Sequence, residues 1–474
     1  MGATGPAEAL SSRYGVEGVG DLEVYEQHGG YDGLRLALDM EPGDIIQTVK
    51  DAGVRGRGGA GFPTGMKWSF VAQDTGKPIY IVCNADEGEP GTFKDRELME
   101  RDPHQLIEGM IVGGLALNAV AGYIYLRGEF VHAGRQLAKA LRQAYAKGYL
   151  GANVMGSGRR FDLTIHRGAG ASLCGEETAL LDSLEGRRGQ PRLRPPFPAT
   201  HGLYGCPTTV NNVESITSVP FILRHGVDWY RQWGTEKSPG PKLMCISGEL
   251  ERPGNYEFAL GTTVAEMIEA CGGMKDGRDL KFFAPGGSST PLLPASAADT
   301  PYTFEDVQAA GSLLGTGALM VYSEQTCVVD MVWGWTRFYE HESCGKCTPC
   351  REGSYWLSQI YQRIETGSGR MEDLELLEDL CDNIFGRVFC ALGDGMTSPI
   401  VSSLEYFRDE YVEHIRLGRC PFGVTEPRRD IGVVEFTVAG GYEAIPPATP
   451  EAAGDPSDTG LTHARDDRAR RVTT

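Results

Sequence analysis

The chain has 474 residues, more than a single hydrophobic core usually serves, so roughly two to four domains are expected. Its formal net charge of −19 argues against nucleic-acid binding and against anionic membrane surfaces, because both are bound through basic side chains. The N-terminus lacks the charged and apolar run of a signal peptide. The longest apolar stretch, residues 110–126, is interrupted by glycines and favours a buried helix and strand over a membrane span. These features predict a cytoplasmic protein.

The predicted elements of the first half alternate between helices and short strands. Residues 1–20 are rich in Gly, Ala and Ser and predict a loose N-terminal arm. Residues 21–240 predict an α/β domain with a largely parallel sheet. The expected strands cover residues 79–83, 122–126 and 161–167, and the expected helices cover residues 44–52, 95–118 and 176–184.

A turn-rich junction at residues 238–241 separates this domain from two smaller ones. Residues 241–327 predict a small α+β domain, with strands at 242–249, 254–259 and 281–283 and a helix at 263–270. Residues 328–420 predict a helical bundle, because apolar residues recur at three- and four-residue spacing in 374–384 and 400–415. Residues 421–474 form a C-terminal extension that is predicted to be disordered from about residue 446.

The strongest single signal is the cysteine run Cys344-Gly-Lys-Cys347-Thr-Pro-Cys350. Iron–sulfur clusters use this spacing together with a remote fourth cysteine, whereas structural zinc sites usually show two separated Cys-x-x-Cys pairs. We favour Cys390 as the fourth ligand, because its glycine-flanked loop leaves backbone amides free for cluster sulfur. Cys381, in an apolar helix, and Cys420 are the competing candidates.

The other cysteines are interpreted differently. Twelve cysteines in a chain of 474 residues are too few for a secreted disulfide scaffold. The isolated ones are expected to be buried small hydrophobic residues: Cys83, Cys174, Cys206, Cys245, Cys271 and Cys327.

A glycine-rich loop, Gly56-Arg57-Gly58-Gly59-Ala60-Gly61, matches G-x-G-x-x-G literally. The dinucleotide-binding fingerprint needs a strand before this motif and a helix directly after it. Here a helix precedes it and Pro63 follows, so an ordinary Rossmann site is not expected. The loop still allows a flat or phosphorylated ligand to lie against backbone. Nearby residues add charge and aromatic surface: Lys67, Phe62, Trp68 and Phe70.

An acidic loop, Asn84-Ala85-Asp86-Glu87-Gly88-Glu89, directly follows a predicted strand, where α/β proteins place ligand contacts. Its carboxylates could bind a divalent metal, act as acid and base, or accept hydrogen bonds from ribose and a flavin ring. The alternative is a solvated acidic turn. A third segment, residues 168–178, has glycines before a helix start, and the helix start at residues 210–215 offers free amides to a phosphate.

Together these segments resemble the NADH-binding flavoprotein subunit of respiratory complex I. The matching motifs occur in the family's order at residues 55–68, 84–95, 168–178, 195–199, 210–215 and 342–353, with Cys390. Residues 247–273 resemble part of the ubiquitin-like β-grasp domain of that family. The resemblance implies an α/β flavin-binding domain, a β-grasp domain and a helical domain that carries a [4Fe–4S] cluster.

The resemblance also implies a role for each matching residue. FMN would be bound by Gly56, Arg57, Gly58, Gly59, Lys67, Asn84, Asp86, Glu87, Gly175, Glu176, Asn211, Asn212 and Ser215. NADH would be bound by Phe62, Phe70, Glu89, Glu177, Arg194 and Phe197. The [4Fe–4S] cluster would be ligated by Cys344, Cys347, Cys350 and Cys390.

Some of these roles are more specific. Glu89 would bind the ribose hydroxyls and repel the 2′-phosphate of NADPH, and Glu177 would lie near the nicotinamide. Arg194 stands where the family usually has Lys, so the charge is kept but the contact geometry differs. Ser215 stands where the family usually has Thr and keeps the hydroxyl.

The implied function is hydride transfer from NADH to FMN, followed by single-electron transfer to the cluster, without a catalytic side-chain acid or base. The chain has no second cluster motif, so the electrons must pass to another polypeptide. The implied partners are a thioredoxin-like [2Fe–2S] subunit and a large multi-cluster iron–sulfur subunit, and the implied location is the inner face of the cell membrane.

Two alternatives remain. The first is the diaphorase subunit of a soluble NAD-linked hydrogenase or formate dehydrogenase. It is less favoured, because such chains often carry an extra N-terminal iron–sulfur module and residues 1–40 contain no cysteine. The second is a non-catalytic scaffold stabilised by zinc, whose β-grasp domain binds a small ligand or a partner.

Overall fold

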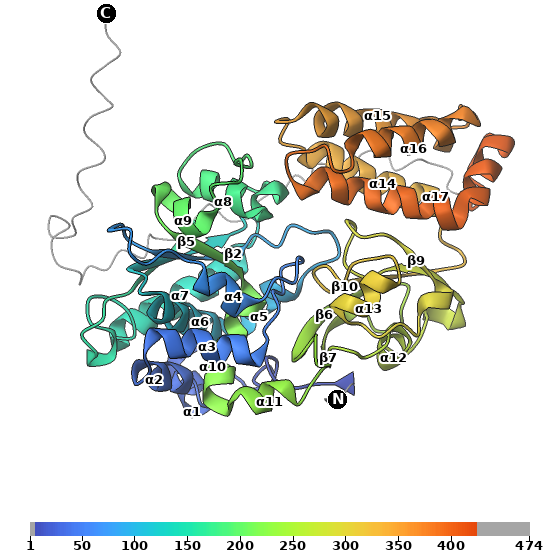
Figure 1. The fold of residues 1–474 in the computed structure, drawn as a ribbon. Coiled ribbons are helices and arrows are strands. Elements are labelled where there is room, and N and C mark those ends of the chain that lie inside the picture. The colour runs from blue at the N-terminus through green and yellow to red at the C-terminus, as the bar shows by residue number, and fades with distance from the viewer. Residues whose placement is uncertain (1–4, 424–474) are drawn as a thin grey trace, which may run out of the picture.

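The structure is a computed structural model in which residues 5–423 are described. The disorder predicted from residue 446 onward lies outside that range. Figure 1 shows an α/β body, a smaller body built on a second sheet, and a helical bundle that lies beside both. The first body holds the glycine-rich and acidic loops, and the bundle holds the cysteine run.

The centre of the α/β body is a four-stranded sheet in the order β4-β3-β2-β5, in which all strands are parallel. Its strands are β2 (Tyr80–Ala85), β3 (Ala121–Leu126), β4 (Asp162–Arg167) and β5 (Thr208–Asn212). The predicted parallel sheet and its first three strands are confirmed. Strand β5 was not predicted, because its sequence Thr-Thr-Val-Asn-Asn is polar and short.

Helices cover both faces of this sheet. The helices of the body are α1 (Leu22–Gln27), α2 (Asp32–Leu38), α3 (Pro42–Ala52), α4 (Thr64–Ser69), α5 (Lys94–Arg101), α6 (Pro103–Leu117), α7 (Val131–Lys147), α8 (Glu177–Leu184), α9 (Pro198–His201), α10 (Val213–His225) and α11 (Val227–Arg231). Alternate residues of β2 face opposite cores, as the period of a strand requires. Ile81 packs in the core that contains α6, and Val82 packs in the core that contains α8.

Helix α6 is the central helix of the body, and all of its residues are buried. The prediction of one continuous helix over residues 95–118 is wrong, because the chain breaks at Asp102 and Pro103 begins α6. Proline lacks the amide donor needed inside a helix but is tolerated in the first turn. Within residues 5–423, none of the helices combines the length and the hydropathy that a membrane crossing requires.

The N-terminal segment differs from the loose arm that its composition predicts. Residues 5–6 form β1 (Gly5–Pro6), which pairs with β7, and the amides of Ala9, Leu10 and Ser11 donate to the buried Glu257 carboxylate. Arg13 donates to Asp102 over 2.7 Å, with both side chains buried. Composition shows the small residues of this segment but not the buried carboxylates that bind its backbone and its arginine.

The second body is built on a six-stranded sheet in the order β1-β7-β6-β10-β8-β9. Its elements are β6 (Pro241–Gly248), β7 (Gly254–Ala259), α12 (Val264–Ala270), β8 (Leu280–Ala284), β9 (Leu293–Pro294), α13 (Phe304–Ala309) and β10 (Ala318–Ser323). The predicted strands and helix are confirmed, and Thr263 with Glu266 forms a capping box at the start of α12. On β10, Leu319 packs in this body's own core, whereas Met320 packs in the core of the helical bundle. The six-stranded sheet therefore forms the boundary between the second body and the helical bundle.

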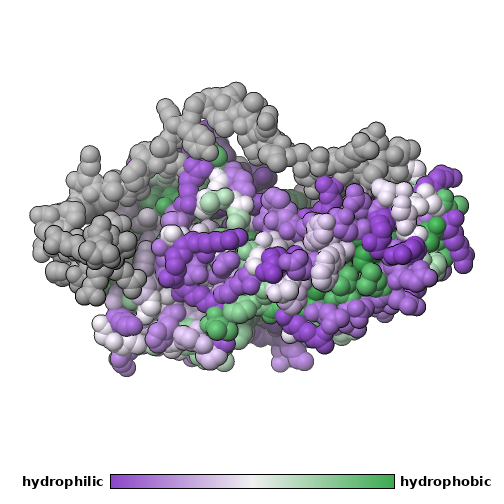
Figure 2. All heavy atoms as spheres, turned by 90° about the horizontal axis from the view of Figure 1, so that it is seen from above, coloured by the Kyte–Doolittle hydropathy of each residue, from purple (hydrophilic) through white to green (hydrophobic). Residues whose placement is uncertain are grey.

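The helical bundle consists of α14 (Val328–Glu342), α15 (Thr348–Glu365), α16 (Glu372–Ile384) and α17 (Ala391–Leu417). The predicted helical patterns at residues 374–384 and 400–415 fall within α16 and α17. The face of the molecule seen in Figure 2 is mostly hydrophilic, with several patches of apolar side chains. Large exposed apolar residues of this bundle include Tyr355, Trp356 and Phe385.

The packing of the N-terminal segment can be tested with Arg13→Ala. This substitution leaves Asp102 buried without its cation, so we expect the free energy of unfolding to fall by about 3–5 kcal/mol. Urea denaturation followed by circular dichroism measures the change. Arg35→Ala, which removes the exposed pair with Asp32, is the matched control and should cost less than about 1 kcal/mol. Equal effects of the two substitutions would contradict the account.

Candidate functional site

The site is formed where β2 and β5 end side by side. These strands are parallel neighbours, with Cys83 opposite Asn211 and Asn84 opposite Asn212. Both chains therefore leave the sheet at the same edge, the usual ligand-binding edge of parallel sheets. The acidic loop follows β2 directly, and α10 follows β5 directly. Asn212 caps α10, because its side-chain oxygen accepts from the amide of Glu214.

The glycine-rich loop lies against the start of α10. It connects α3 to α4, so no strand precedes it, and the expectation that it is not an ordinary Rossmann loop is confirmed. The Arg57 amide donates to Ser215 Oγ over 2.9 Å. A Cβ atom added at Gly58 would lie 3.0 Å from Cβ of Asn212, whereas one added at Gly59 would meet open space. The loop thus presents backbone closely packed on one side and open on the other.

Asp86 lies in this edge with an unsatisfied carboxyl group. Its side chain is buried, and Oδ2 has no hydrogen-bond partner among residues 5–423. Burial raises the pKa of Asp86 to about 7. A Cβ atom added at Gly175 would lie 3.4 Å from Asp86 Oδ2, and Asn84 donates to the Gly175 carbonyl over 2.8 Å. A buried acceptor without a donor, beside glycine backbone, fits a ligand that brings N–H or O–H groups.

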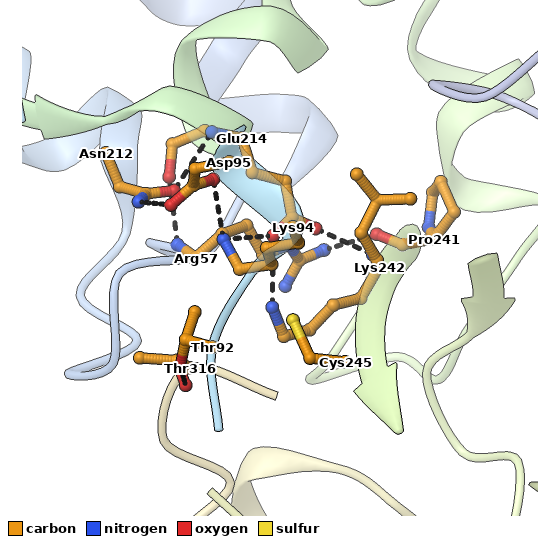
Figure 3. Close-up of polar contacts among 12 residues, drawn as sticks. Arg57, Thr92, Lys94, Asp95, Asn212, Glu214, Pro241, Lys242, Cys245 and Thr316 are labelled. Atoms are coloured by element: carbon orange, nitrogen blue, oxygen red, sulfur yellow. Dashed lines mark hydrogen bonds and ion pairs between the residues drawn. The ribbon is translucent and has the colours of Figure 1, made fainter. Parts of the chain in front are cut away.

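A buried network of charges lies behind the start of α10 (Figure 3). The Glu214 carboxylate pairs with Lys94 Nζ over 2.8 Å and with Lys242 Nζ over 3.1 Å, and Lys94 also pairs with Asp95. Burial alone would raise the pKa of Glu214, but Lys242 and Lys94 hold it at about 2. Asn212 donates to Asp95 over 2.7 Å, which connects the network to the helix cap.

Three basic side chains lie in this network against two paired carboxylates. The basic side chains are Arg57, Lys94 and Lys242, and the carboxylates are Glu214 and Asp95. Burial lowers the pKa of Lys242 to about 8 and raises the pKa of the nearby Glu87 to about 8. Basic side chains next to the free amides of a helix N-terminus fit an anionic group such as a phosphate. Sequence reasoning missed this network. Lys94 and Glu214 lie within the matched motifs at residues 84–95 and 210–215 but were given no role there, and Lys242 lies outside every motif.

Two of the predicted FMN residues use their side chains elsewhere. Nη2 of the buried Arg57 guanidinium donates to the Tyr230 hydroxyl and to the carbonyls of Pro239 and Pro241, whereas its Nη1 has no hydrogen-bond partner among residues 5–423. Glu87 accepts from the amides of Asp95 and Arg96 and thereby caps α5. Both side chains stabilise the segments that form the site.

Glu89, predicted to bind ribose, lies at a contact between the three bodies. Its carboxylate accepts from the Ser289 amide over 2.8 Å and from the Ser288 hydroxyl over 3.3 Å. The Ser288 hydroxyl in turn lies 2.7 Å from the Tyr339 hydroxyl in α14. Desolvation raises the pKa of Glu89. The contact with Ser289 could not be found from sequence, since this residue lies 200 positions further along the chain.

Ion pairs join four of the remaining predicted FMN and NADH residues: Lys67, Glu176, Glu177 and Arg194. Glu177 pairs with Lys67 over 2.8 Å and with Arg194 over 3.2 Å, which links α4, α8 and the segment before α9. Glu176 caps α8 by accepting from the amides of Thr178 and Ala179. The three predicted aromatic rings are 48–57% exposed, although large apolar side chains are usually buried: Phe62, Phe70 and Phe197. The ring centroids of Phe62 and Phe70 lie 6.2 Å apart.

The cysteine run lies at the start of α15, and Cys390 immediately precedes α17. Burial, with smaller effects of Glu176 and of the Cys344 and Cys350 thiols, raises the pKa of Cys390 to about 11. Burial also raises the pKa of Cys350, next to Cys347 and Cys344. Cys390 therefore lies near Cys344 and Cys350, and the Leu392 amide lies close enough to donate to its sulfur. Cys381 is buried in the interior of α16, and Cys420 lies beside Cys327.

The cysteine loop is also fixed against the α/β body. The Cys344 carbonyl accepts from Arg188 and Gln190, and Lys346 donates to the Pro191 carbonyl. The Glu342 carboxylate accepts from the amide of Ser172, 2.8 Å away and three residues before Gly175. The cysteine loop is therefore held next to the segment that contains Gly175, the neighbour of Asp86.

Comparisons with known proteins show the family to which the chain belongs. A family model described as the Nuo51 FMN-binding domain matches residues 49–221, one described as the SLBB domain matches residues 243–293, and one described as the NADH-ubiquinone oxidoreductase-F iron-sulfur binding region matches residues 330–414. The NADH-quinone oxidoreductase F subunit of Streptomyces coelicolor is 58% identical over 416 residues, which cover 88% of this chain and 93% of the relative. The chain belongs to this family of NADH-quinone oxidoreductase subunits.

Other relatives carry the same name. The one from Mycobacterium tuberculosis is 58% identical over 85% of this chain and 92% of the relative, and the one from Rickettsia felis is 47% identical over 84% and 94%. A solved structure of an NAD⁺-reducing [NiFe]-hydrogenase in the H₂-reduced state superposes with a TM-score of 0.76 at 35% identity, covering 89% of this chain and 68% of that chain. The α/β domain thus has the fold of an FMN-binding domain, and the bundle that of an iron–sulfur binding region.

The residues of this chain fit both FMN and an iron–sulfur cluster. The unsatisfied Asp86 oxygen, the glycine-rich loop and the buried basic side chains fit a flavin with a phosphate, and the neighbouring thiols of Cys344, Cys347, Cys350 and Cys390 fit an iron–sulfur cluster. The chain is the component of complex I that oxidises NADH on FMN and transfers electrons through a [4Fe–4S] cluster.

The burial of Asp86 predicts how the stability of the flavin-free chain depends on pH. The native pKa, about 7, lies above the ordinary value of 3.8, so ionisation of this carboxyl costs stability; the cost is absent below about pH 4 and complete above about pH 7. Asp86→Asn should therefore stabilise the flavin-free chain by about 2–4 kcal/mol at pH 8, and by about 1 kcal/mol less at pH 6. Urea denaturation at both pH values measures this gain.

The control for this experiment is Asp74→Asn, at an exposed aspartate in the turn before β2, which should change stability little at either pH. A gain that is the same at pH 6 and pH 8, or a loss of stability, would show that the carboxyl is not desolvated.

Proposed function

We propose that FMN lies at the carboxyl edge of the β4-β3-β2-β5 sheet, with the glycine-rich loop on one side and Gly175 on the other. The observation that carries this proposal is the buried, unsatisfied Asp86 Oδ2 beside Gly175. In this arrangement the Asp86 carboxylate would accept a hydrogen bond from the ring edge and the Asn84 side-chain amide would donate one to it, next to Gly175 and Glu176. Gly56, Gly58 and Gly59 let the ligand approach their backbone.

The phosphate of FMN would lie at the start of α10. Asn211, Asn212 and Ser215 surround this helix start, and the buried network behind it supplies basic side chains. Arg57 contributes its backbone and its charge, because its guanidinium is engaged by Tyr230 and Pro241. Glu87 acts by capping α5, so that its role is to position the acidic loop.

NADH would enter at the mouth of the site. The exposed rings of Phe62, Phe70 and Phe197 offer stacking surface for the adenine, and such exposure has no structural purpose in the free chain. Lys67 and Arg194 pair with Glu177 there, and Arg194 also lies 3.7 Å from Glu176, so the nicotinamide would meet two cations and two carboxylates. Arg194 can pair through a planar fork, which a lysine at this position could not do.

The chemistry requires little from the side chains themselves. When bound, FMN accepts the hydride of NADH and the [4Fe–4S] cluster accepts electrons singly. The residues of the chain orient the two rings against each other and exclude water, so proximity is their main contribution. Cys344, Cys347, Cys350 and Cys390 would hold the cluster, and the contact between Ser172 and Glu342 keeps the cysteine loop next to the flavin edge.

We propose the partners and location that the family resemblance implies: a thioredoxin-like [2Fe–2S] subunit and a large multi-cluster subunit, on the cytoplasmic face of the cell membrane. The exposed side chains of Tyr355, Trp356 and Phe385, close in sequence to the cluster cysteines, support a protein contact at this end of the bundle. We also propose that residues 241–327 form a β-grasp domain, which is supported by the β6–β7 hairpin, helix α12 across the sheet, and β10 parallel to β6.

The second candidate is a diaphorase subunit of a soluble NAD-linked hydrogenase. It is supported by the superposition on the NAD⁺-reducing [NiFe]-hydrogenase. The NADH-quinone oxidoreductase relatives are more similar, at 58% identity against 35%, and each is covered almost completely by the chain. We therefore favour complex I.

The division of labour between the domains can be tested with Cys344→Ala. We expect the purified chain to lose its cluster iron, while NADH still bleaches the flavin absorbance under anaerobic conditions, because the flavin site contains none of the cysteines. Cys381→Ala, at a buried cysteine outside the loop, should keep both iron and flavin reduction. Loss of flavin reduction in Cys344→Ala with the flavin still bound would refute this division, and a wild-type chain without flavin would refute the proposed function.

The choice between NADH and NADPH can be tested with Glu89→Gln. Removing this charge removes repulsion of the 2′-phosphate, so kcat/KM for NADPH should rise relative to that for NADH by about 10-fold, which corresponds to about 1.4 kcal/mol. Steady-state rates with both nucleotides measure the ratio. Glu129→Gln, at a partly exposed carboxylate paired with Arg127, is the control and should leave the ratio unchanged. An unchanged ratio in Glu89→Gln would assign Glu89 to the contact with Ser288 and Ser289 alone.

A further inference from the structure

A second group of metal-ligand side chains lies in the helical bundle, away from the cluster cysteines. Cys327 caps α14, Glu365 is the last residue of α15, His414 lies in the last turn of α17, and Cys420 follows that helix. All four are buried. Glu365 is 15 residues from Cys350 along α15, which at about 1.5 Å per residue separates the two by about 22 Å. The group is therefore distinct from the cluster site.

The ligand atoms of this group have the spacing of a tetrahedral site. Cys327 Sγ lies 3.3 Å from His414 Nε2 and 3.8 Å from Glu365 Oε1, and His414 Nε2 lies 3.4 Å from Glu365 Oε1. All four ligand atoms, including Cys420 Sγ, lie within 4.8 Å of one another. A tetrahedron with Zn–S of about 2.3 Å and Zn–N or Zn–O of about 2.0–2.1 Å has edges of about 3.3–3.8 Å.

The neighbours of these residues orient them for binding. The ring nitrogen Nδ1 of His414 lies 2.7 Å from the Glu410 carbonyl, so it carries the proton and leaves the lone pair of Nε2 directed at the group. The Asp330 amide lies 3.3 Å from Cys327 Sγ and can donate to a thiolate. Such outer contacts accompany metal-binding histidines and cysteines.

The two thiols add little to the hydrogen bonding of this group. His414 and Glu365 can pair with each other, whereas thiols are weak donors and acceptors. A divalent cation would engage both thiolates, the carboxylate and the imidazole at once.

We propose that Cys327, Glu365, His414 and Cys420 bind one zinc ion in a closed structural site. Two cysteines, one histidine and one carboxylate are a soft and borderline ligand set that suits zinc, and four protein ligands leave no open position for catalysis. With both thiols deprotonated, the site has the same net charge of about −1 as a Cys3His zinc site. It would join the end of α17 to the junction between β10 and α14, next to the ion pair of Lys281 and Glu410.

The proposal can be tested on the full chain, purified with its flavin and cluster from cells supplied with zinc. Elemental analysis should find about one zinc atom per chain in addition to the cluster iron. X-ray absorption at the zinc edge should show two sulfur ligands at about 2.3 Å and two nitrogen or oxygen ligands at about 2.0–2.1 Å. Neither measurement depends on NADH oxidation, so this test is independent of the proposed function.

Variants assign the metal to these residues. Cys420→Ser should lose the zinc and keep the cluster iron, whereas Cys344→Ala should lose the iron and keep the zinc. Cys381→Ser, at a buried cysteine of the same bundle that lies outside both groups, should keep both metals. If Cys420→Ser does not fold, the absorption spectrum of the wild-type chain decides the question.

Three results would overturn the proposal. The first is a wild-type chain with full iron and less than ~0.1 zinc atoms per chain. The second is additional iron in place of zinc. The third is zinc that stays bound when Cys327 and Cys420 are both replaced by serine.

Discussion

The Glu214 carboxylate is fully buried, and it holds together segments from distant parts of the chain. Lys94 from α5 and Lys242 from β6 pair with one of its oxygens, and the Leu243 amide donates to the other over 2.9 Å. A buried charge is strongly unfavourable unless it is paired and hydrogen-bonded, so the folded chain must bring these groups together. The same residue belongs to the first turn of α10, whose amides face the glycine-rich loop. Ligand site and domain packing therefore share one electrostatic constraint.

This constraint matters because electron transfer requires redox groups at fixed positions in different domains. Lys242 lies in the first long strand of the second body, so its pairing with Glu214 orients that body on the α/β body. The second body in turn meets Glu89 through Ser289, and the bundle meets Ser172 through Glu342. Each contact joins two bodies through a charged or backbone group with defined geometry. These contacts help to fix the positions of the glycine-rich loop and the cysteine loop relative to each other.

Much of this arrangement was predictable where the signal is local. The apolar run of β2, the apolar content of α6 and the capping residues of α12 each identify an element from neighbouring residues alone. The four-thiol group could also be proposed from the sequence, since three of its members follow a short repeat. Side-chain direction was not predictable: Arg57 belongs to the glycine motif but its guanidinium binds Pro239 and Pro241, which lie more than 180 positions later. The ordered N-terminal segment was missed for the same reason, because its partners Asp102 and Glu257 lie far away in sequence.

The cysteines of the bundle show this limit most clearly. In the cluster loop the spacing is itself the signal, because three thiols within seven residues can meet at one point only if the chain wraps round it. Cys327 was expected to be an isolated hydrophobic residue, and it is buried, but its thiol faces His414, 87 positions away. These two residues meet only when the helices of the bundle pack, so their proximity could not be predicted from their spacing in the sequence. A metal site assembled in this way depends on the tertiary fold, and the metal would in turn stabilise the packing that assembles the site.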